Sequence, residues 1–127
     1  MEDKVIKMEV VNPGTAGIDV GSRSHWVAVG QREEDVREYG VFNDDLFSLC
    51  DWLKESKVQT IAMESTGTYW QNLYAVLISR GFHVILCNGK FTKNIKGKKT
   101  DIKDCQWIQR LHSLGLLSSS FLPEGKT

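Results

Sequence analysis

Short apolar runs alternate with polar turns over the first third of this chain. Val, Ile, Trp, Tyr and Phe concentrate in residues 16–21, 25–31 and 36–42, and the charged residues 32–35 separate the last two runs. This pattern predicts three consecutive β-strands. Because the connections are only a few residues long, we expect the three strands to pair in antiparallel fashion.

From residue 43 the apolar spacing changes to that of a helix, and helices then alternate with strands. Asn43 is expected to cap the first helix. The apolar face of this helix repeats at offsets 0, 3, 4 and 7 and consists of Leu46, Leu49, Cys50 and Leu53. The remaining predicted elements are strands over 57–64 and 83–88 and helices over 69–80 and 101–114. Thr68 and Gln71 match a capping box for the second helix, and Thr100 is expected to cap the third.

The predicted element order, β-β-β-α-β-α-β-α, restricts the topology of the sheet. Strands four and five follow helices, so right-handed crossovers place them parallel to strand one. The hairpin strands then lie on the other side of strand one, which gives the strand order 3-2-1-4-5. We therefore expect an α/β fold with a mixed five-stranded sheet flanked by helices, the ribonuclease H-like topology.

The bulk properties of the chain are those of one soluble globular domain. Its 127 residues suffice for a core, and 41% of them are hydrophobic and 25% charged. No apolar run approaches the ~18–20 residues of a membrane helix, and the first residues lack a signal-peptide core. Cys50, Cys87 and Cys105 are odd in number and widely spaced, which argues against a disulfide framework or a zinc cluster and favours a reducing cytoplasm.

Four acidic residues lie at the predicted ends of buried elements: Asp19, Glu64, Asp101 and Asp104. A carboxylate in a buried strand ionises at a high free-energy cost unless a compensating partner is present. On the last helix, Asp101 and Asp104 share the apolar stripe, so both are expected to point toward the sheet. Oxygen ligands from several elements suit Mg²⁺ or Mn²⁺, and two such ions about 3.5–4 Å apart promote phosphodiester chemistry. The four acids therefore predict a two-metal site.

Each acid taken alone also has a purely structural explanation. Asp101 could be a first-turn acid that the helix dipole favours, and Glu64 could lead into a helix cap. The metal-site hypothesis therefore depends on all four residues together, and on a topology that places strand one beside strand four.

The formal net charge of zero conceals an uneven distribution of charge. Residues 88–103 contain one acid and six lysines, namely Lys90, Lys93, Lys96, Lys98, Lys99 and Lys103. Residues 31–55 contain eight acids and three bases. A lysine cluster can be a solvated loop, but beside a carboxylate site it favours contact with a phosphate backbone. We therefore expect the six lysines to bind nucleic acid.

Other aromatic and histidine residues carry weaker signals. Trp26, Trp52 and Trp107 are expected to be core or half-buried packing residues, and the pair at positions 69–70 either packs or stacks on a base. The three histidines (positions 25, 83 and 112) lack metal-ligand spacing and are expected to be surface or packing residues.

Three sequence blocks resemble one family of mobile-element proteins. They are Gly-Ile-Asp-Val-Gly at 17–21, Met-Glu-Ser-Thr-Gly-Thr-Tyr-Trp at 63–70 and Lys-Thr-Asp-Ile-Lys-Asp at 99–104. Together they resemble the DEDD transposases, the insertion-sequence one-ten family of bacteria and archaea. The resemblance implies that residues 16–115 form a RuvC-like catalytic domain, with the fold of Holliday-junction resolvases, in which the four acids hold Mg²⁺ or Mn²⁺.

The resemblance also implies a set of partners. DNA would be recombined with the help of a guide (bridge) RNA made from the element itself, by a homo-oligomer (dimer or tetramer) located in the cytoplasm at the nucleoid. Residues 1–15 would be an N-terminal arm, and residues 116–127 a linker to a C-terminal domain that supplies a serine nucleophile. Because the sequence ends at Thr127, we expect the chain to be inactive in recombination by itself.

Three other interpretations fit parts of the sequence. Residues 17–22 also resemble the first phosphate loop of sugar kinases and actin-like ATPases, but the Gly-rich adenosine loops of those proteins are missing from the sequence. A stand-alone Holliday-junction nuclease fits the four acids, whereas the Tyr69-Trp70 block favours the transposase. A non-catalytic module that binds nucleic acid and metal for assembly is the third alternative.

Overall fold

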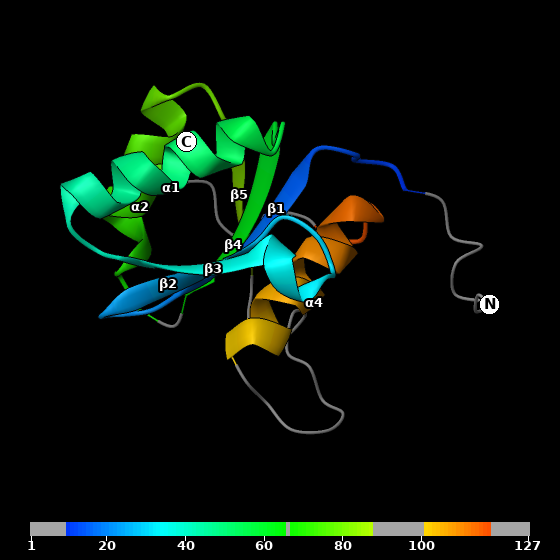
Figure 1. Ribbon diagram of the computed structural model, residues 1–127, viewed down its shortest axis with the longest axis horizontal. Coiled ribbons are helices and arrows are strands. Elements are labelled where there is room, and N and C mark those ends of the chain that lie inside the picture. Colours follow the sequence, from blue (N-terminus) through cyan, green and yellow to red (C-terminus); the bar gives the residue numbers. More distant parts are fainter. Residues whose placement is uncertain (1–9, 66, 88–100, 118–127) are drawn as a thin grey trace.

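A computed structural model describes residues 10–65, 67–87 and 101–117, and a five-stranded sheet forms its centre (Figure 1). The strands are β1 (Thr15–Val20), β2 (Ser24–Ala28), β3 (Val36–Gly40), β4 (Thr60–Ser65) and β5 (His83–Cys87). Their order is β3-β2-β1-β4-β5, as predicted. Strands β1, β2 and β3 pair antiparallel, whereas β1, β4 and β5 pair parallel, which confirms the mixed sheet.

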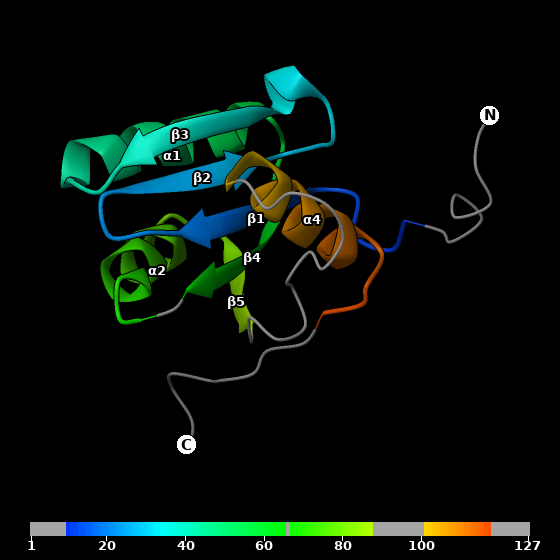
Figure 2. The ribbon, with the colours of Figure 1, turned by 90° about the horizontal axis from the view of Figure 1, so that it is seen from below.

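Helices cover both faces of this sheet. Helices α1 (Asn43–Glu55) and α2 (Trp70–Ser79) lie on one face, and α4 (Asp101–Ser113) lies on the other (Figure 1 and Figure 2). A 3-10 turn, η2 (Glu33–Asp35), precedes β3. The layers, the element order and the strand order together are those of the ribonuclease H-like fold.

The larger hydrophobic core lies between the sheet and helices α1 and α2. Ile18 and Met63 contribute from the central strands, and Leu49 and Leu77 from the helices, and all four are fully shielded from solvent. Burial of a side chain of this size stabilises the fold by about 1.5–3 kcal/mol. Because successive strand residues face opposite sides of the sheet, Ile18 faces this core while its two neighbours in β1 face α4.

Gly17 determines how closely α4 approaches the sheet. A Cβ atom at position 17 would lie 2.6 Å from the Cys105 carbonyl oxygen and 2.8 Å from the Gln109 Cα atom, and it would also overlap the Gln109 backbone nitrogen. All of these atoms belong to the α4 backbone, which cannot move aside as a flexible side chain could. The backbone of α4 therefore rests directly on β1, and its first turn comes close to the end of β1 at Val20.

Two predicted helix caps are wrong. Phe42, not Asn43, is the N-cap residue of α1, and the Asp45 Oδ2 atom accepts a hydrogen bond of 3.1 Å from the Phe42 backbone N–H. Tyr69 is the N-cap residue of α2 in a helical conformation and makes no side-chain cap hydrogen bond, so the box predicted from Thr68 is not formed. The acid at the third helical position, and not a polar cap residue, therefore accepts the hydrogen bond from the backbone N–H at the start of α1.

Several predicted strands are longer than the observed ones. The strand expected over 57–64 begins only at Thr60, because Lys57 adopts a left-handed conformation (φ 63°) and Val58 donates its N–H to the Leu53 carbonyl oxygen at 3.0 Å. These residues terminate α1. The strand expected over 25–31 ends at Ala28, beyond which the Gln31 side chain instead donates to the Gln106 carbonyl oxygen of α4 at 2.8 Å.

Candidate metal centre

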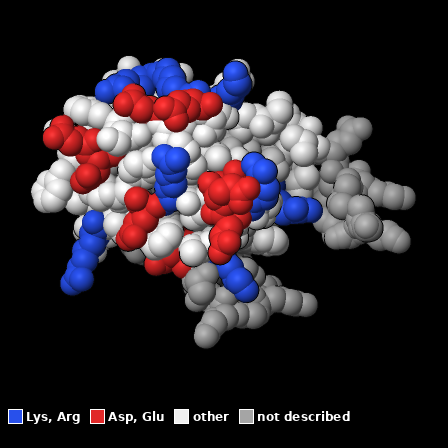
Figure 3. Space-filling view, viewed as in Figure 1, with Lys and Arg blue, Asp and Glu red and all other residues white. Residues whose placement is uncertain are grey.

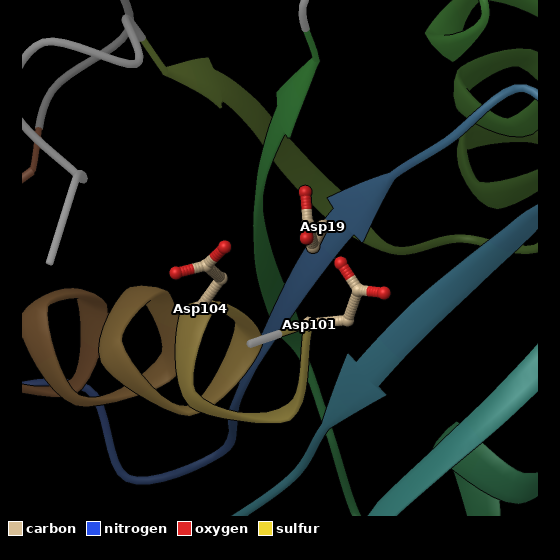
Figure 4. A group of neighbouring side chains, drawn as sticks. All are labelled: Asp19, Asp101 and Asp104. Atoms are coloured by element: carbon tan, nitrogen blue, oxygen red, sulfur yellow. The ribbon is translucent and has the colours of Figure 1, made fainter. Parts of the chain in front are cut away.

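Three aspartates from two elements converge at the end of β1. One carboxylate oxygen each from Asp19, Asp101 and Asp104 can be chosen so that all three oxygens lie within 4.8 Å of one another. Figure 4 shows Asp19 projecting from β1 and the other two side chains projecting from the first turn of α4 toward the same space. Asp19 and Asp104 are half-buried and Asp101 is exposed, so the cluster lies at the surface with one side in contact with solvent.

The local structure explains why these side chains meet. Asp19 lies two residues after Gly17 and therefore faces α4 as Gly17 does. Asp101 and Asp104 are three residues apart in a helix, a spacing that places both on one side. Ile108 continues that side one turn further and is buried, with 1% exposure, against the sheet. The buried part of α4 and the missing side chain of residue 17 thus hold the acidic first turn beside Asp19.

Glu64 lies on the neighbouring strand at the same level. It is the register partner of Asp19 in the parallel pair of β1 and β4, so the two side chains stand on the same face of the sheet. Within the described residues, the group whose oxygens approach within 4.8 Å comprises the three aspartates and does not include Glu64. The structure therefore brings three of the four predicted acids together and places the fourth beside them.

The environment of Asp19 opposes its ionisation when no cation is present. Its pKa is raised from 3.8 to about 7, first because burial removes the carboxylate from water and next because of the negative charge of Glu64. Repulsion from Asp104 and then Asp101 adds to the effect, as does a hydrogen bond with Asp101. A group of acids that disfavours its own ionisation is stabilised by a cation that binds among them.

Two thiols lie next to this cluster and do not change its chemical character. Cys87 is the register partner of Glu64, and Cys105 follows Asp104 in α4. Both thiols are buried, and burial is the main reason that their pKa values are raised to about 12, with the charge of Glu64 next for Cys87 and that of Asp19 next for Cys105. Neutral thiols are poor metal ligands. The donors are therefore carboxylate oxygens, which suit Mg²⁺ or Mn²⁺.

A hollow of about 280 Å³ opens beside the acids. Asp19 and Asp101 line it on one side, and Arg23 and Trp26 are among its other lining residues. The sequence pattern predicted a core or half-buried packing role for Trp26, and the side chain is half-buried, but it also lines the hollow beside the acids, which was not predicted. Its register with Asp19 could not be found in the sequence, because that register depends on where the turn between β1 and β2 begins and ends.

Most of the predicted nucleic-acid-binding lysines lie outside the described residues. These are Lys90, Lys93, Lys96, Lys98 and Lys99. Lys103 is described and lies exposed in the first turn of α4, between the two helix acids. On the face shown in Figure 3, acidic and basic side chains of the described residues alternate in small groups. The predicted lysine surface stays a prediction.

Comparison with known proteins gives one informative match. No curated protein matches the chain, whereas the family model of the IS110-type DEDD transposases, described as "Transposase", matches residues 16–126. None of the described helices is long and apolar enough to cross a membrane. The match covers all four acids and most of the chain, and transposases of this family act on DNA and use divalent metal ions. By its sequence and its ribonuclease H-like fold, the chain belongs to the IS110-type DEDD transposase family.

Proposed function

We propose that residues 16–115 form the RuvC-like catalytic domain of a DNA transposase, and that its four acids hold two divalent cations, Mg²⁺ or Mn²⁺. The observation that carries this proposal is the convergence of Asp19, Asp101 and Asp104, with oxygens of all three within 4.8 Å. The proposed ligand set is completed by Glu64, which stands beside Asp19 on the next strand.

The residues present fit such ions. All four donors are carboxylates, their negative charges crowd one another, and the cluster lies at the surface where a hydrated ion can enter. When bound, a pair of divalent ions would stabilise charge on the attacking and leaving oxygens of a phosphodiester. In this proposal Asp19 lies close to the helix acids and beside Glu64, and all four residues would hold the ions.

The nucleic-acid partners follow from the family and from the lysines. DNA is the substrate of a transposase, and a guide RNA and a homo-oligomeric assembly are the further partners that we propose. Contacts to the phosphate backbone would come from the lysines at 90–99 and from Lys103, because ammonium groups on flexible stems suit phosphate contact with little sequence preference.

Calorimetric titration of Mg²⁺ and Mn²⁺ tests the proposal directly. We expect the wild-type chain to bind either ion, and the variants Asp19→Asn and Asp104→Asn to lose that binding with an unchanged fold. Asp44→Asn is the matched control, because Asp44 also lies in the first turn of a helix, α1, and is exposed. Equal metal affinity in Asp19→Asn, Asp104→Asn and wild type would refute the metal assignment.

Catalysis needs a second experiment. In a transposase that contains this domain, either substitution should abolish strand exchange while the melting temperature of the protein stays the same or rises. Metal binding that is lost without any loss of strand exchange would leave the chain with a metal-binding, non-catalytic role, and would contradict the catalytic part of the proposal.

A further inference from the structure

The hollow beside the metal centre has an aromatic wall that cation binding does not require. Trp26 stands opposite Asp19 in the antiparallel pair of β1 and β2, so the indole and the carboxylate lie side by side on one face of the sheet. Within the described part of the chain the Trp26 side chain has no ring contact or hydrogen bond. Trp26 is half-buried and lines the hollow, so part of its indole is available to a ligand there.

The position of α4 explains why this tryptophan is accessible. Trp26 and Ala28 face the same side of the sheet, and Ala28 is completely buried whereas Trp26 is half-buried. The difference follows from where the helix begins: its first residue, Asp101, lies at the level of Asp19. Among the described residues, α4 therefore covers β2 near Ala28 and does not extend over Trp26.

An arginine completes the lining of the hollow. Arg23 lies in the turn between β1 and β2, is exposed, and makes no ion pair or hydrogen bond with another described residue. The Gly21 N–H donates to the His25 ring at 3.3 Å, and the His25 side chain is buried, so one end of this turn is fastened to the core. The hollow thus combines a guanidinium, an indole and two carboxylates of the metal centre.

We propose that this hollow binds one nucleotide of a nucleic-acid strand, with its base stacked on Trp26 and a phosphate beside Arg23 and the acids. This inference rests on the proposed function, because the phosphate would approach the acids only with a divalent cation between them. A bare cation would contact the carboxylates alone. A nucleotide would use all three groups, because its base would stack on the indole and its phosphate would contact the guanidinium and the cation held by the carboxylates.

The size of the hollow fits the same ligand. Its volume of about 280 Å³ is just below the roughly 300–1,000 Å³ of sites for drug-sized molecules, which is the size range expected for a single nucleotide. Stacking on an indole is tolerant of sequence because every base has a π-face. The site therefore selects an unpaired nucleotide next to the reacting phosphate, without selecting which base it carries.

Two pentanucleotide probes distinguish the contribution of the base to the binding affinity from that of the phosphates. A thymidine pentanucleotide and its abasic analogue carry the same phosphates, and their affinities for the chain are measured in Mg²⁺. In the wild type the thymidine probe should bind about 5- to 100-fold more tightly than the abasic probe. Trp26→Leu should reduce this ratio to about one, Trp26→Phe should retain most of it, and Arg23→Gln should weaken both probes alike.

Phe47→Leu is the matched control, because Phe47 is a partly exposed aromatic residue of α1, on the opposite face of the sheet. Equal affinity for the two probes in the wild type would overturn the inference, whatever the variants do. An unchanged ratio in folded Trp26→Leu would also overturn it. Failure of the metal assignment appears separately, as unchanged Mg²⁺ affinity in Asp19→Asn.

Discussion

Asp19 and Glu64 stand directly beside each other on parallel strands, with both side chains on the face that α4 covers. Two acids in this relationship repel each other, and burial and the charge of Glu64 are the two largest reasons why the pKa of Asp19 is raised to about 7. The fold thus holds the Asp19 and Glu64 carboxylates close together, which is electrostatically unfavourable when no cation is bound. Such an arrangement favours the binding of a cation.

Divalent cations should stabilise the chain against heat. Binding to the folded state alone adds RT ln(1 + [L]/Kd), about 2.7 kcal/mol at a concentration of 100 times Kd. We expect Mg²⁺ to raise the melting temperature of the wild type and to leave that of Asp19→Asn unchanged. Without metal above pH 7, Asp19→Asn should melt at a higher temperature than the wild type, because the substitution removes a charge that burial and Glu64 disfavour. The opposite order of melting temperatures would contradict this electrostatic account.

The stability of the metal-free chain should depend on pH through Asp19. Its pKa is higher in the folded state (about 7) than the ordinary value of 3.8, so the folded state binds the extra proton between these values. The stabilisation is therefore fully present below about pH 4 and is lost as the pH rises toward 7. Chemical denaturation of the wild type and of Asp19→Asn at a series of pH values measures this contribution as the difference between the two profiles.

His112 should produce a slope of opposite sign in the same range. Burial lowers its pKa from 6.5 to about 4, with a smaller contribution from the charge of His83, so its stabilisation is present above pH 6.5 and is lost as the pH falls through 4. In Asp19→Asn the free energy of unfolding should therefore fall between pH 6.5 and 4. A flat profile in that variant would show that His112 is not buried in its neutral form.

Gly17→Ala should weaken both the fold and the metal centre. The new methyl group would overlap the Cys105 carbonyl oxygen and the Gln109 backbone, so α4 must move away from β1. Overpacking of this kind costs about 1–3 kcal/mol. The same movement would separate Asp101 and Asp104 from Asp19, so the Mg²⁺ affinity should fall as well.

Gly67→Ala is the matched control for this substitution. A Cβ atom at position 67 would lie 3.4 Å from the nearest atom, in the Tyr69 ring, which is ordinary van der Waals contact. Its free energy of unfolding should change little. If Gly17→Ala and Gly67→Ala had the same small effect on stability and on metal binding, the close approach of α4 to β1 would not be the feature that positions the acids.

The strand order was predictable because it depends on features that are local in sequence, and the acidic cluster was predictable because that strand order brings acids from distant parts of the sequence together. Short connections determined the hairpins, crossovers determined the parallel strands, and the three-residue spacing of Asp101 and Asp104 determined their common side. The helix caps were not predictable: at the start of α1, for example, Asp45 and not Asn43 accepts the hydrogen bond from the Phe42 backbone N–H. Which acids come within ligand distance also depends on side-chain direction, and the sequence could not show that Glu64 stands apart from the group of three.

The half-buried state of Trp26 agrees with the sequence prediction, whereas its place beside Asp19 was not predicted. A tryptophan in a strand with alternating apolar residues has the signature of a packing residue, and its register with Asp19 is defined only in the folded sheet. The Thr60 hydroxyl forms hydrogen bonds with the His83 ring (2.8 Å) and the His112 ring (2.9 Å). These bonds were not predictable either, because the three residues belong to three elements that meet only in the folded sheet. Sequence spacing carries no signal for such a meeting.

Replacing three of the lysines between β5 and α4 should change how nucleic-acid binding depends on salt. Each phosphate contact with duplex DNA contributes about 0.9 to the slope of log K against log salt concentration. If Lys90, Lys93 and Lys96 all contact phosphates, changing them to Gln lowers the magnitude of that slope by up to about 2.7.

The charge-matched control changes three lysines elsewhere in the chain, at positions 4, 7 and 126, to Gln. Both triple variants remove three positive charges, so a general effect of net charge alters both slopes equally. A direct phosphate contact alters only the slope of the variant at Lys90, Lys93 and Lys96. Equal slopes for the two variants would mean that these lysines are a solvated segment, and the contacts with DNA or RNA would then have to come from other residues.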